Sequence, residues 1–244
     1  MSRTVCIIQA RMGSSRLPGK VLMDLHGWPM IAHVVDRASR IRGVDQVVLA
    51  TSSLPGDDPL ATWAESWPGL RCIRGPEDDV LERYRMAAAA TGADIIMRVT
   101  GDCPVLDPDV STAVLELFLQ EPRVDYVSNT LERTFPRGLD TEVFSREAME
   151  TAAREATGAS DREHVTPFLW RQPERFRMRQ YVDTADHSTE RWTVDTREDF
   201  ALLQALLEGW TGGDAPLSSR DLLRRLESTP GLRAINASVT QKVV

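Results

Sequence analysis

The first half of the chain alternates between short apolar runs and segments of helical periodicity. Thr4–Gln9, Gln46–Ala50 and Ile95–Val99 are runs rich in β-branched residues, and each is followed by a polar loop that contains glycine. Pro29–Ser39 and Asp79–Thr91 carry apolar residues at helical spacing. This succession predicts an α/β fold, with a mostly parallel open sheet and helices on both of its faces.

In an open parallel sheet, ligands bind beyond the carboxyl ends of the strands. The loops Gln9–Lys20, Thr51–Asp58 and Thr100–Pro104 follow three of the predicted strands, so we expect them to share one rim. Further elements are expected in this half: a helix over Pro59–Ser66, a strand over Leu70–Arg74 and a helix that Asp107 caps and Pro108 begins.

The pattern changes after Asp125, where strands become shorter and polar segments longer. We expect strands over Asp125–Ser128, Glu142–Phe144, Arg175–Val182 and Glu190–Val194. We expect helices from a capping box at Ser160 through Trp170, over Arg197–Leu207 after Thr196, and over Asp221–Leu226 after Ser218. The tail Arg233–Val244 is expected to be poorly structured. We therefore predict a single domain over residues 1–244, with a small inserted α+β lobe at 129–190.

Composition narrows the setting of the protein. The 244 residues are 42% hydrophobic and carry a net charge of −7, so broad affinity for nucleic acid is not expected. Cys6, Cys72 and Cys103 are scattered and form neither a disulfide framework nor a zinc pattern. No apolar run approaches the ~20 residues that span a bilayer, and the start resembles no signal peptide. We expect a cytoplasmic protein without a membrane partner.

The loop Gln9–Lys20 combines glycine, serine and basic residues directly after a buried strand. Gly13 and Gly19 allow the backbone to approach a ligand, and the amides around Ser14 and Ser15 can point at phosphate oxygens. Its three cations are Arg11, Arg16 and Lys20. In an acidic chain this density of donors predicts a triphosphate site. The alternative is an ordinary solvated loop; the sequence is neither a P-loop nor a dinucleotide motif.

Two carboxylates are candidate metal ligands. Asp102 lies in the turn after Ile95–Val99, where it can hold Mg²⁺ against a phosphate. Asp195 can complete such a site. The alternatives are that Asp102 only bonds backbone amides in its turn and that Asp195 only caps a helix beside Thr196.

Several ordered motifs resemble the cytidylyltransferases that activate acidic sugars as CMP esters. They are ARMGSSRLPGK at 10–20, TGDCP at 100–104 and VDTREDF at 194–200. RGPEDDVLERY at 74–84, PRGLDTE at 136–142 and REHVTP at 162–167 resemble the branch named for spore-coat polysaccharide synthesis, which is related to CMP-ketodeoxyoctonate and CMP-sialic acid synthetases. The resemblance covers nearly the whole chain and implies a Rossmann-like, GT-A-like nucleotidyltransferase fold.

The resemblance also implies roles for individual residues. Nucleotide binding is expected from Ala10, Arg11, Gly13, Ser14, Ser15, Arg16, Lys20, Ser52, Asp79, Arg83, Thr100 and Gly101, with Asp79 and Arg83 near the nucleoside. Magnesium is expected on Asp102 and Asp195. The acceptor is expected to contact Asn129, Arg137, Asp140, Glu142, Arg162 and His164. Catalysis is expected from Arg11, Lys20, Asp102 and His164.

The resulting interpretation is attack by an acceptor oxygen on the α-phosphorus of CTP, with pyrophosphate as the leaving group. The partners are then CTP and a small anionic acceptor, and the resemblance implies a homodimer formed through the inserted lobe. Three alternatives stay open: a phosphonate or phosphate acceptor, another nucleoside triphosphate, and a glycosyltransferase-like protein that only binds sugar nucleotides.

Overall fold

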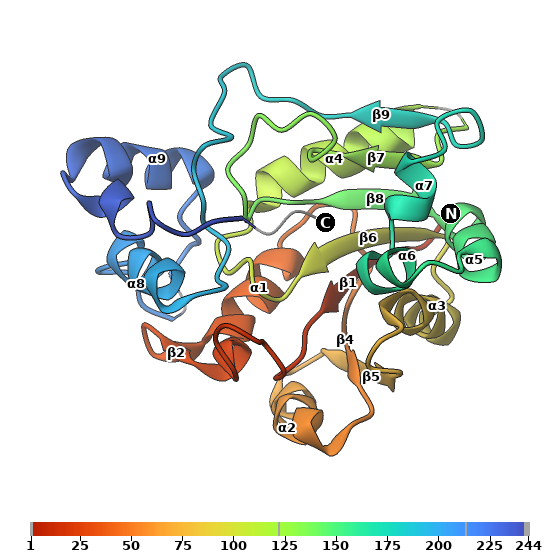
Figure 1. Ribbon diagram of the computed structural model, residues 1–244, viewed down its shortest axis with the longest axis horizontal. Helices are drawn as coiled ribbons and strands as arrows, with labels where there is room; N and C mark the ends of the chain where they lie inside the picture. Colours follow the sequence, from red (N-terminus) through yellow and green to blue (C-terminus); the bar gives the residue numbers. More distant parts are fainter. Residues whose placement is uncertain (1, 122, 213, 242–244) are drawn as a thin grey trace.

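A seven-stranded sheet crosses the centre of the computed structural model, which describes residues 2–121, 123–212 and 214–241. Its strands, in spatial order, are β5 (Arg71–Gly75), β4 (Gln46–Ser52), β1 (Thr4–Gln9), β6 (Ile95–Thr100), β8 (Glu142–Ser145), β7 (Tyr126–Ser128) and β9 (Met178–Gln180) (Figure 1). The four strands β5, β4, β1 and β6 are parallel. Strand β8 is antiparallel to β6 and β7, and β9 is parallel to β7. The predicted mostly parallel open sheet is confirmed.

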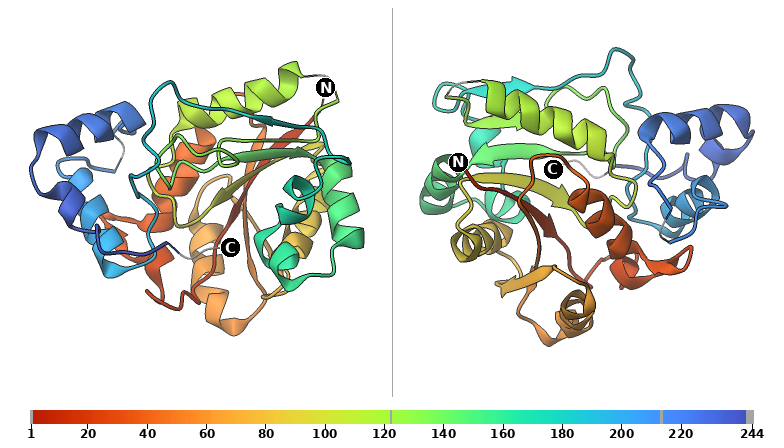
Figure 2. Two further views of the ribbon diagram at one scale, coloured as in Figure 1. Left: turned by 45° about the horizontal axis from the view of Figure 1, so that its top comes forward. Right: turned by 180° about the vertical axis from the view of Figure 1, so that it is seen from behind.

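Helices cover both faces of this sheet, as Figures 1 and 2 show. Strand β1 explains why, because its buried side chains alternate between two apolar clusters: Cys6 and Ile8 enter one, and Val5 and Ile7 enter the other. The first cluster includes side chains of α1 (Met30–Ser39), α2 (Asp58–Ser66), α4 (Pro108–Gln120), α8 (Arg197–Leu206) and α9 (Ser219–Ser228). The second includes α3 (Val80–Thr91), α5 (Arg146–Glu155) and α7 (Pro167–Trp170).

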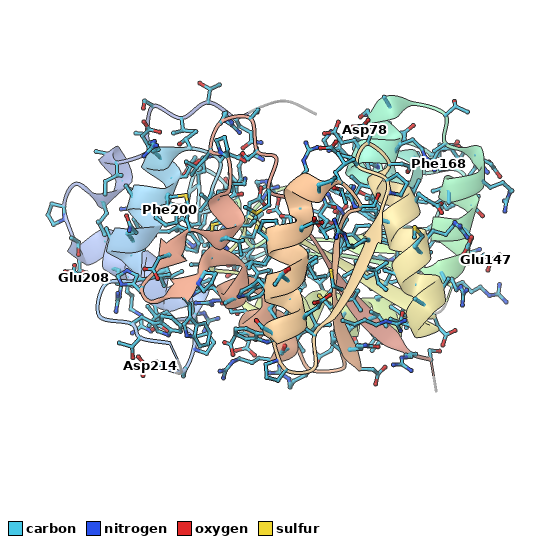
Figure 3. The ribbon with its side chains drawn as sticks, turned by 90° about the horizontal axis from the view of Figure 1, so that it is seen from below. Asp78, Glu147, Phe168, Phe200, Glu208 and Asp214 are labelled. Atoms are coloured by element: carbon cyan, nitrogen blue, oxygen red, sulfur yellow. The ribbon has the colours of Figure 1, made fainter. Side chains whose placement is uncertain are left out.

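The segment 129–190 adds its strands β8 and β9 to the main sheet. It places α5 and the short α6 (Ala159–His164) beside α3, and α7 packs against α5 and α6. Seen from below, Glu147 and Phe168 of this segment lie at the opposite end of the molecule from Phe200 and Glu208 (Figure 3). A separate two-stranded ribbon, β2 (Asp24–Leu25) and β3 (Trp28–Pro29), precedes α1.

Helix starts were mostly predictable from their capping residues. Asp107 caps α4, and Thr196 and Ser218 form capping boxes at α8 and α9. The capping box at Ser160 is wrong, because α6 follows Gly158 without a side-chain cap. The single helix through Trp170 is also wrong. Val165 has a positive φ of 74°, which ends α6 and separates it from α7.

Two further expectations are corrected near the end of the chain. Residues 190–194 form no strand: Arg191 makes only an isolated bridge with Arg137, because its side chain is drawn to the carboxylates of Asp195 and Asp199. The tail is ordered as far as it is described. It forms a 3₁₀ turn, η3 (Leu232–Ala234), and buries Asn236; residues 242–244 lie outside the described part.

No helix among the described residues is both long and apolar enough to cross a membrane.

Burial of His33 makes the fold sensitive to acid. Its Nε2 donates to the Leu25 carbonyl at 2.8 Å, and its ring lies 4.8 Å from that of Trp210. Burial lowers its pKa from an ordinary 6.5 to about 4, so the folded protein holds it neutral while the unfolded chain takes up a proton below pH 6.5. His33 therefore stabilises the fold above that pH, and this contribution is lost as pH falls toward 4.

We predict that His33→Gln, which keeps a neutral donor, loses less stability on acidification than the wild type. The difference should be about 2–3 kcal/mol between pH 7 and pH 4.5, measured by urea unfolding at both values. Equal losses in the two proteins would contradict the assignment.

Candidate active site

A cavity of about 940 Å³ opens beyond the carboxyl ends of β1 and β6. Two of the three loops predicted to share this rim line it, the loop after β1 and the turn after β6. The third, Thr51–Asp58, does not line it but supports the first loop from behind. Asp57 accepts hydrogen bonds from the Met12 amide at 2.6 Å and from the amide and hydroxyl of Ser52. Ser52 is fully buried, so the structure does not bring it to the cavity.

Lys20 lines the cavity and contacts both candidate carboxylates. The left-handed backbone of Gly19 (φ 73°) turns the loop into η1 (Lys20–Leu22) and directs the lysine inward. Its ammonium donates to the Val194 carbonyl at 2.5 Å, to Asp195 Oδ1 at 3.0 Å and to Asp102 Oδ2 at 3.2 Å. Burial alone would lower the pKa of Lys20, but the two carboxylates raise it above its usual range. The site therefore holds a permanent cation between two carboxylates.

Asp102 is placed by the close approach of two loops. The Gly101 amide donates to the Gln9 carbonyl at 2.8 Å. A Cβ on Gly101 would come within 2.6 Å of the Ala10 Cβ, so only glycine permits this contact. Asp102 follows immediately and is oriented toward Lys20, with the Cys103 thiol donating to its Oδ1 at 3.6 Å. The glycine before Asp102 in the motif TGDCP is therefore required by this close contact.

Asp195 is held by three cations. Besides Lys20, Arg191 Nη2 donates to its Oδ2 at 2.7 Å, and Arg16 Nη2 lies 2.8 Å from the same oxygen. Burial would raise the pKa of Asp195, but Lys20 and the two arginines lower it below the ordinary value. The carboxylate is ionised at neutral pH.

The two carboxylates form a donor set that fits a divalent cation. Mg²⁺ prefers oxygen ligands and is commonly bound by one or two carboxylates together with substrate phosphates. Asp102 and Asp195 converge on one ammonium, so a hard cation in their reach would meet two carboxylate oxygens. Within the described ranges, no group of three or more His, Cys, Asp or Glu side chains is arranged to hold a metal ion. A metal here would need ligands from a bound substrate.

The remaining loop residues surround the carboxylates with donors. The cavity is lined by Ala10, Arg11, Gly13, Ser14, Ser15 and Arg16, and by Thr100 and Gly101 of the neighbouring turn. Arg11 Nη1 lies 3.5 Å from Glu77 Oε1, and both residues line the cavity. Glu77 and Asp78 also line this side and were missed from the sequence.

Asp79 and Arg162 bind each other instead of lining the cavity. Asp79 Oδ1 accepts from the Glu82 amide and caps α3, while its Oδ2 accepts from Arg162 Nε at 3.0 Å and from Nη2. Arg83 does line the cavity, but its Nη1 donates to the carbonyls of Pro76 and Glu77 and so shapes the Glu77–Asp78 wall.

The wall opposite the loop carries the predicted acceptor residues. Arg137, Asp140, Glu142 and His164 line the cavity, whereas Asn129 is buried and bonded to Leu139 and Thr141. Asp140 accepts from both terminal nitrogens of Arg133, at 2.6 and 2.9 Å. The side chain of Arg137 has no hydrogen-bonded carboxylate among the residues described.

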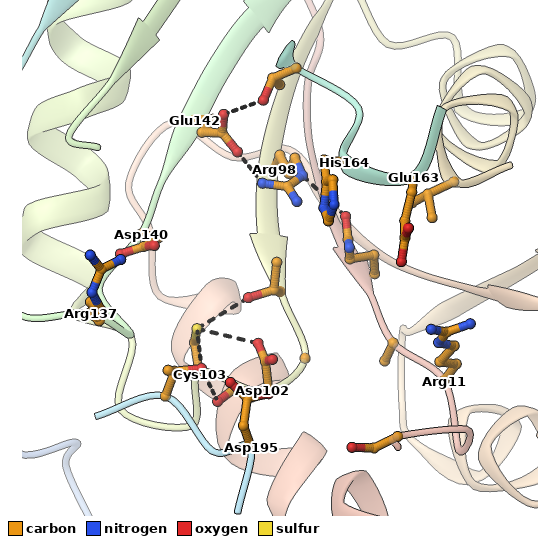
Figure 4. Close-up of a pocket in the computed structure, with 18 of the residues that line it drawn as sticks. Arg11, Arg98, Asp102, Cys103, Arg137, Asp140, Glu142, Glu163, His164 and Asp195 are labelled. Atoms are coloured by element: carbon orange, nitrogen blue, oxygen red, sulfur yellow. Dashed lines mark hydrogen bonds and ion pairs between the residues drawn. The ribbon is translucent and has the colours of Figure 1, made fainter. Parts of the chain in front are cut away.

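Arg98 was missed, although it lines the same wall (Figure 4). Its Nη1 donates to Glu142, whose other oxygen accepts from the hydroxyls of Tyr126 and Thr166 at 2.6 Å each. Burial would lower the pKa of Arg98, but Glu142 raises it. Its position as the one charged residue in the apolar run IIMRV is a signal that could have identified it.

His164 lies beside Arg98 at this end of the cavity (Figure 4). Burial lowers its pKa below 6.5, an effect that Glu163 opposes and Arg98 reinforces. The imidazole is therefore neutral at pH 7 and able to accept a proton.

We compared the chain with known protein families, proteins and solved structures. Residues 5–211 match the family model described as cytidylyltransferase. This chain belongs to the cytidylyltransferase family. It is therefore a nucleotidyltransferase, as the motifs predicted.

The chain is 33% identical to the spore coat polysaccharide biosynthesis protein SpsF of Bacillus subtilis, over 94% of this chain and 96% of that protein. Among solved structures, a cytidylyltransferase from Leptospira borgpetersenii superposes with a TM-score of 0.90 at 30% identity and covers all of both chains. A CMP-2-keto-3-deoxy-manno-octonic acid synthetase complexed with CTP superposes with a TM-score of 0.67 at 23% identity, over 84% of this chain and 98% of that one, and so shares the fold.

We predict that Lys20→Met lowers the melting temperature. Millimolar Mg²⁺ should raise the melting temperature of the variant by more than it raises that of the wild type. Without the ammonium, Asp102 loses its salt bridge and Asp195 keeps its ion pairs with Arg16 and Arg191, so the two carboxylates repel each other and a divalent cation can replace the lost charge. Melting with and without Mg²⁺ measures this. Arg40→Met, which breaks an exposed pair with Asp36 on α1, is the control and should respond to Mg²⁺ as the wild type does. An equal Mg²⁺ response in all three proteins would refute the shared site.

Proposed function

We propose that the protein transfers CMP from CTP to a small acidic acceptor, such as an acidic sugar, and releases pyrophosphate in a magnesium-dependent reaction. The observation that carries this proposal is that Asp102 and Asp195 both bind Lys20. They do so next to a loop with many groups that can donate hydrogen bonds to phosphate. Membership of the cytidylyltransferase family supports CTP as the nucleotide.

The triphosphate would lie along the loop after β1. The backbone amides near Ser14 and Ser15, with Arg11 and Arg16, would bind its oxygens. Asp102 and Asp195 would hold Mg²⁺, which when bound offsets negative charge on the phosphates. Lys20, held 3.0 and 3.2 Å from these carboxylates, would stabilise charge that develops on the leaving group.

The reaction itself needs little covalent help from the protein. An acceptor oxygen would attack the α-phosphorus, the bond from this phosphorus to the oxygen that bridges to the β-phosphorus would break, and pyrophosphate would leave with that electron pair. The chain would contribute alignment of acceptor and leaving group on opposite walls of one cavity.

The acceptor would occupy the wall of Arg98, Arg137 and His164. Arg137 has no hydrogen-bonded carboxylate within the described ranges, and Arg98 keeps its Nη2 without a hydrogen-bond partner there, so both have donors for an anion. A carboxylate acceptor would need no base, whereas a sugar hydroxyl would lose its proton to His164. A phosphonate or phosphate acceptor is the second candidate, favoured by the same two arginines. Arg162 and Arg191 do not contribute to it, since both are engaged by aspartates.

We also propose that the protein is a single domain, that it is cytoplasmic and that it forms a homodimer through segment 129–190. Asp140 is proposed to lie on the acceptor side.

The proposed reaction is tested by incubating the protein with CTP, UTP, dTTP or GTP and a panel of acidic sugars and phosphonates, and then measuring pyrophosphate. CTP-specific pyrophosphate release would support the proposal. Nucleotide binding without release under any condition would favour the sugar-nucleotide-binding alternative.

We predict that Asp102→Asn lowers CTP-dependent pyrophosphate release by at least about 100-fold, because an amide binds Mg²⁺ much more weakly than a carboxylate. The melting temperature should stay within a few degrees of the wild type. Asp109→Asn, at an exposed carboxylate on α4, is the matched control and should keep full activity. Near-normal turnover by Asp102→Asn would exclude its role as a metal ligand.

We predict that turnover of a hydroxyl acceptor is flat from pH 7 to 8 and declines only below pH 6.5, because the pKa of His164 is lowered. His164→Gln should reduce kcat by about 100-fold and remove this acid limb. Glu147→Gln, at an exposed carboxylate on α5 that does not line the cavity, serves as control in the same pH–rate measurement. An unchanged profile in His164→Gln would remove the histidine from the mechanism.

A further inference from the structure

The C-terminal segment of the chain returns to the active-site cavity. After α9 and η3 it runs back toward the sheet (Figures 1 and 2). Gln241 lines the cavity together with Asp195 and Arg137. The match to the cytidylyltransferase family ends at residue 211, so this segment lies outside the part that defines the family.

Asn236 fixes the segment in place. It is 7% exposed, and its Nδ2 donates to the Arg191 carbonyl and to Asp199 Oδ1, each at 3.0 Å. Asp199 is also the N3 residue of the capping box of α8, and its Oδ2 accepts from the Asp195 amide at 3.0 Å. The tail is thereby bonded to the same buried carboxylate that supports the backbone of Asp195.

Arg191 connects the tail to the carboxylate of Asp195. All three nitrogens of its guanidinium are engaged: Nε with Asp199 Oδ1 at 3.0 Å, Nη1 with the side-chain oxygen of Gln241, and Nη2 with Asp195 Oδ2 at 2.7 Å and Asp199 Oδ2 at 3.1 Å. A guanidinium is planar and rigid, so holding two of its corners fixes the direction of the third. Gln241 and Asp199 therefore determine where Arg191 presents its donor to Asp195.

We propose that the C-terminal segment 236–241 is a working part of the active site, in which Gln241 is a positioning residue that orients Asp195 through Arg191. The inference rests on the proposed function, because it gives Asp195 the role of a metal ligand. Residues that orient metal ligands through hydrogen bonds commonly change metal affinity by about 10- to 100-fold when they are replaced. A tail that only covered the apolar core would have no such effect on the metal.

The test compares three variants of the full chain. Gln241→Leu removes the oxygen that accepts from Arg191, Gln241→Glu retains an acceptor oxygen at that position, and Gln120→Leu alters an exposed glutamine on α4 as a matched control. Two quantities are measured for each: the Mg²⁺ concentration for half-maximal pyrophosphate release, and the CTP dissociation constant by calorimetry with and without Mg²⁺. Melting curves verify folding, and a chain that ends at Val239 provides a second way to remove Gln241.

We expect Gln241→Leu and the shortened chain to need about tenfold more Mg²⁺ and to bind CTP more weakly only when Mg²⁺ is present. Gln120→Leu should behave as the wild type, and Gln241→Glu, which keeps an acceptor for Arg191, should need less Mg²⁺ than Gln241→Leu. Unchanged Mg²⁺ dependence in both Gln241→Leu and the shortened chain would overturn the inference while leaving the proposed function intact. If the wild type itself shows no Mg²⁺-dependent binding of CTP, the proposed function fails and the inference fails with it.

Discussion

The ammonium of Lys20 joins three segments that are far apart in the sequence: the loop after β1, the turn after β6 and the strip that ends at Asp195. Only 9% of this side chain is exposed. A buried cation is costly unless its partners satisfy it, and here two carboxylates and a carbonyl do so. Because these partners lie on different segments, the same contact that neutralises the lysine also assembles the cavity floor.

The choice of lysine is informative in this chain. Lys20 is one of only two lysines among 29 basic residues, and arginine is used at nearly every other basic position. A compact ammonium places a point charge between two carboxylates, whereas a planar guanidinium would spread them apart. The arginines are used where a fork is needed, as in the contacts of Arg133 with Asp140 and of Arg191 with Asp199. Each basic residue type matches the geometry of its site.

Much of this arrangement was predictable from local sequence, because strands, caps and loop chemistry depend on near neighbours. The run at Thr4–Gln9 gave β1 with correct bounds, and the loop that follows lines the cavity as expected. Asp79 was different: the family resemblance implied that it lies near the nucleoside, but its side chain is paired with Arg162, 83 positions away. Neither the choice of such distant partners nor the ordering of the tail by Asn236 can be predicted from neighbouring residues in the sequence. Arg98 could have been predicted, because it is a charged residue within an apolar strand.

We propose that the carboxylates around Lys20 form a metal-assisted triphosphate site. Crystals grown with CTP and Mn²⁺ test it most directly, because anomalous scattering locates the metal. We predict a metal peak bound by Asp102 and Asp195, with the triphosphate along Gln9–Lys20. A nucleotide bound elsewhere, or a metal that contacts neither aspartate, would contradict it.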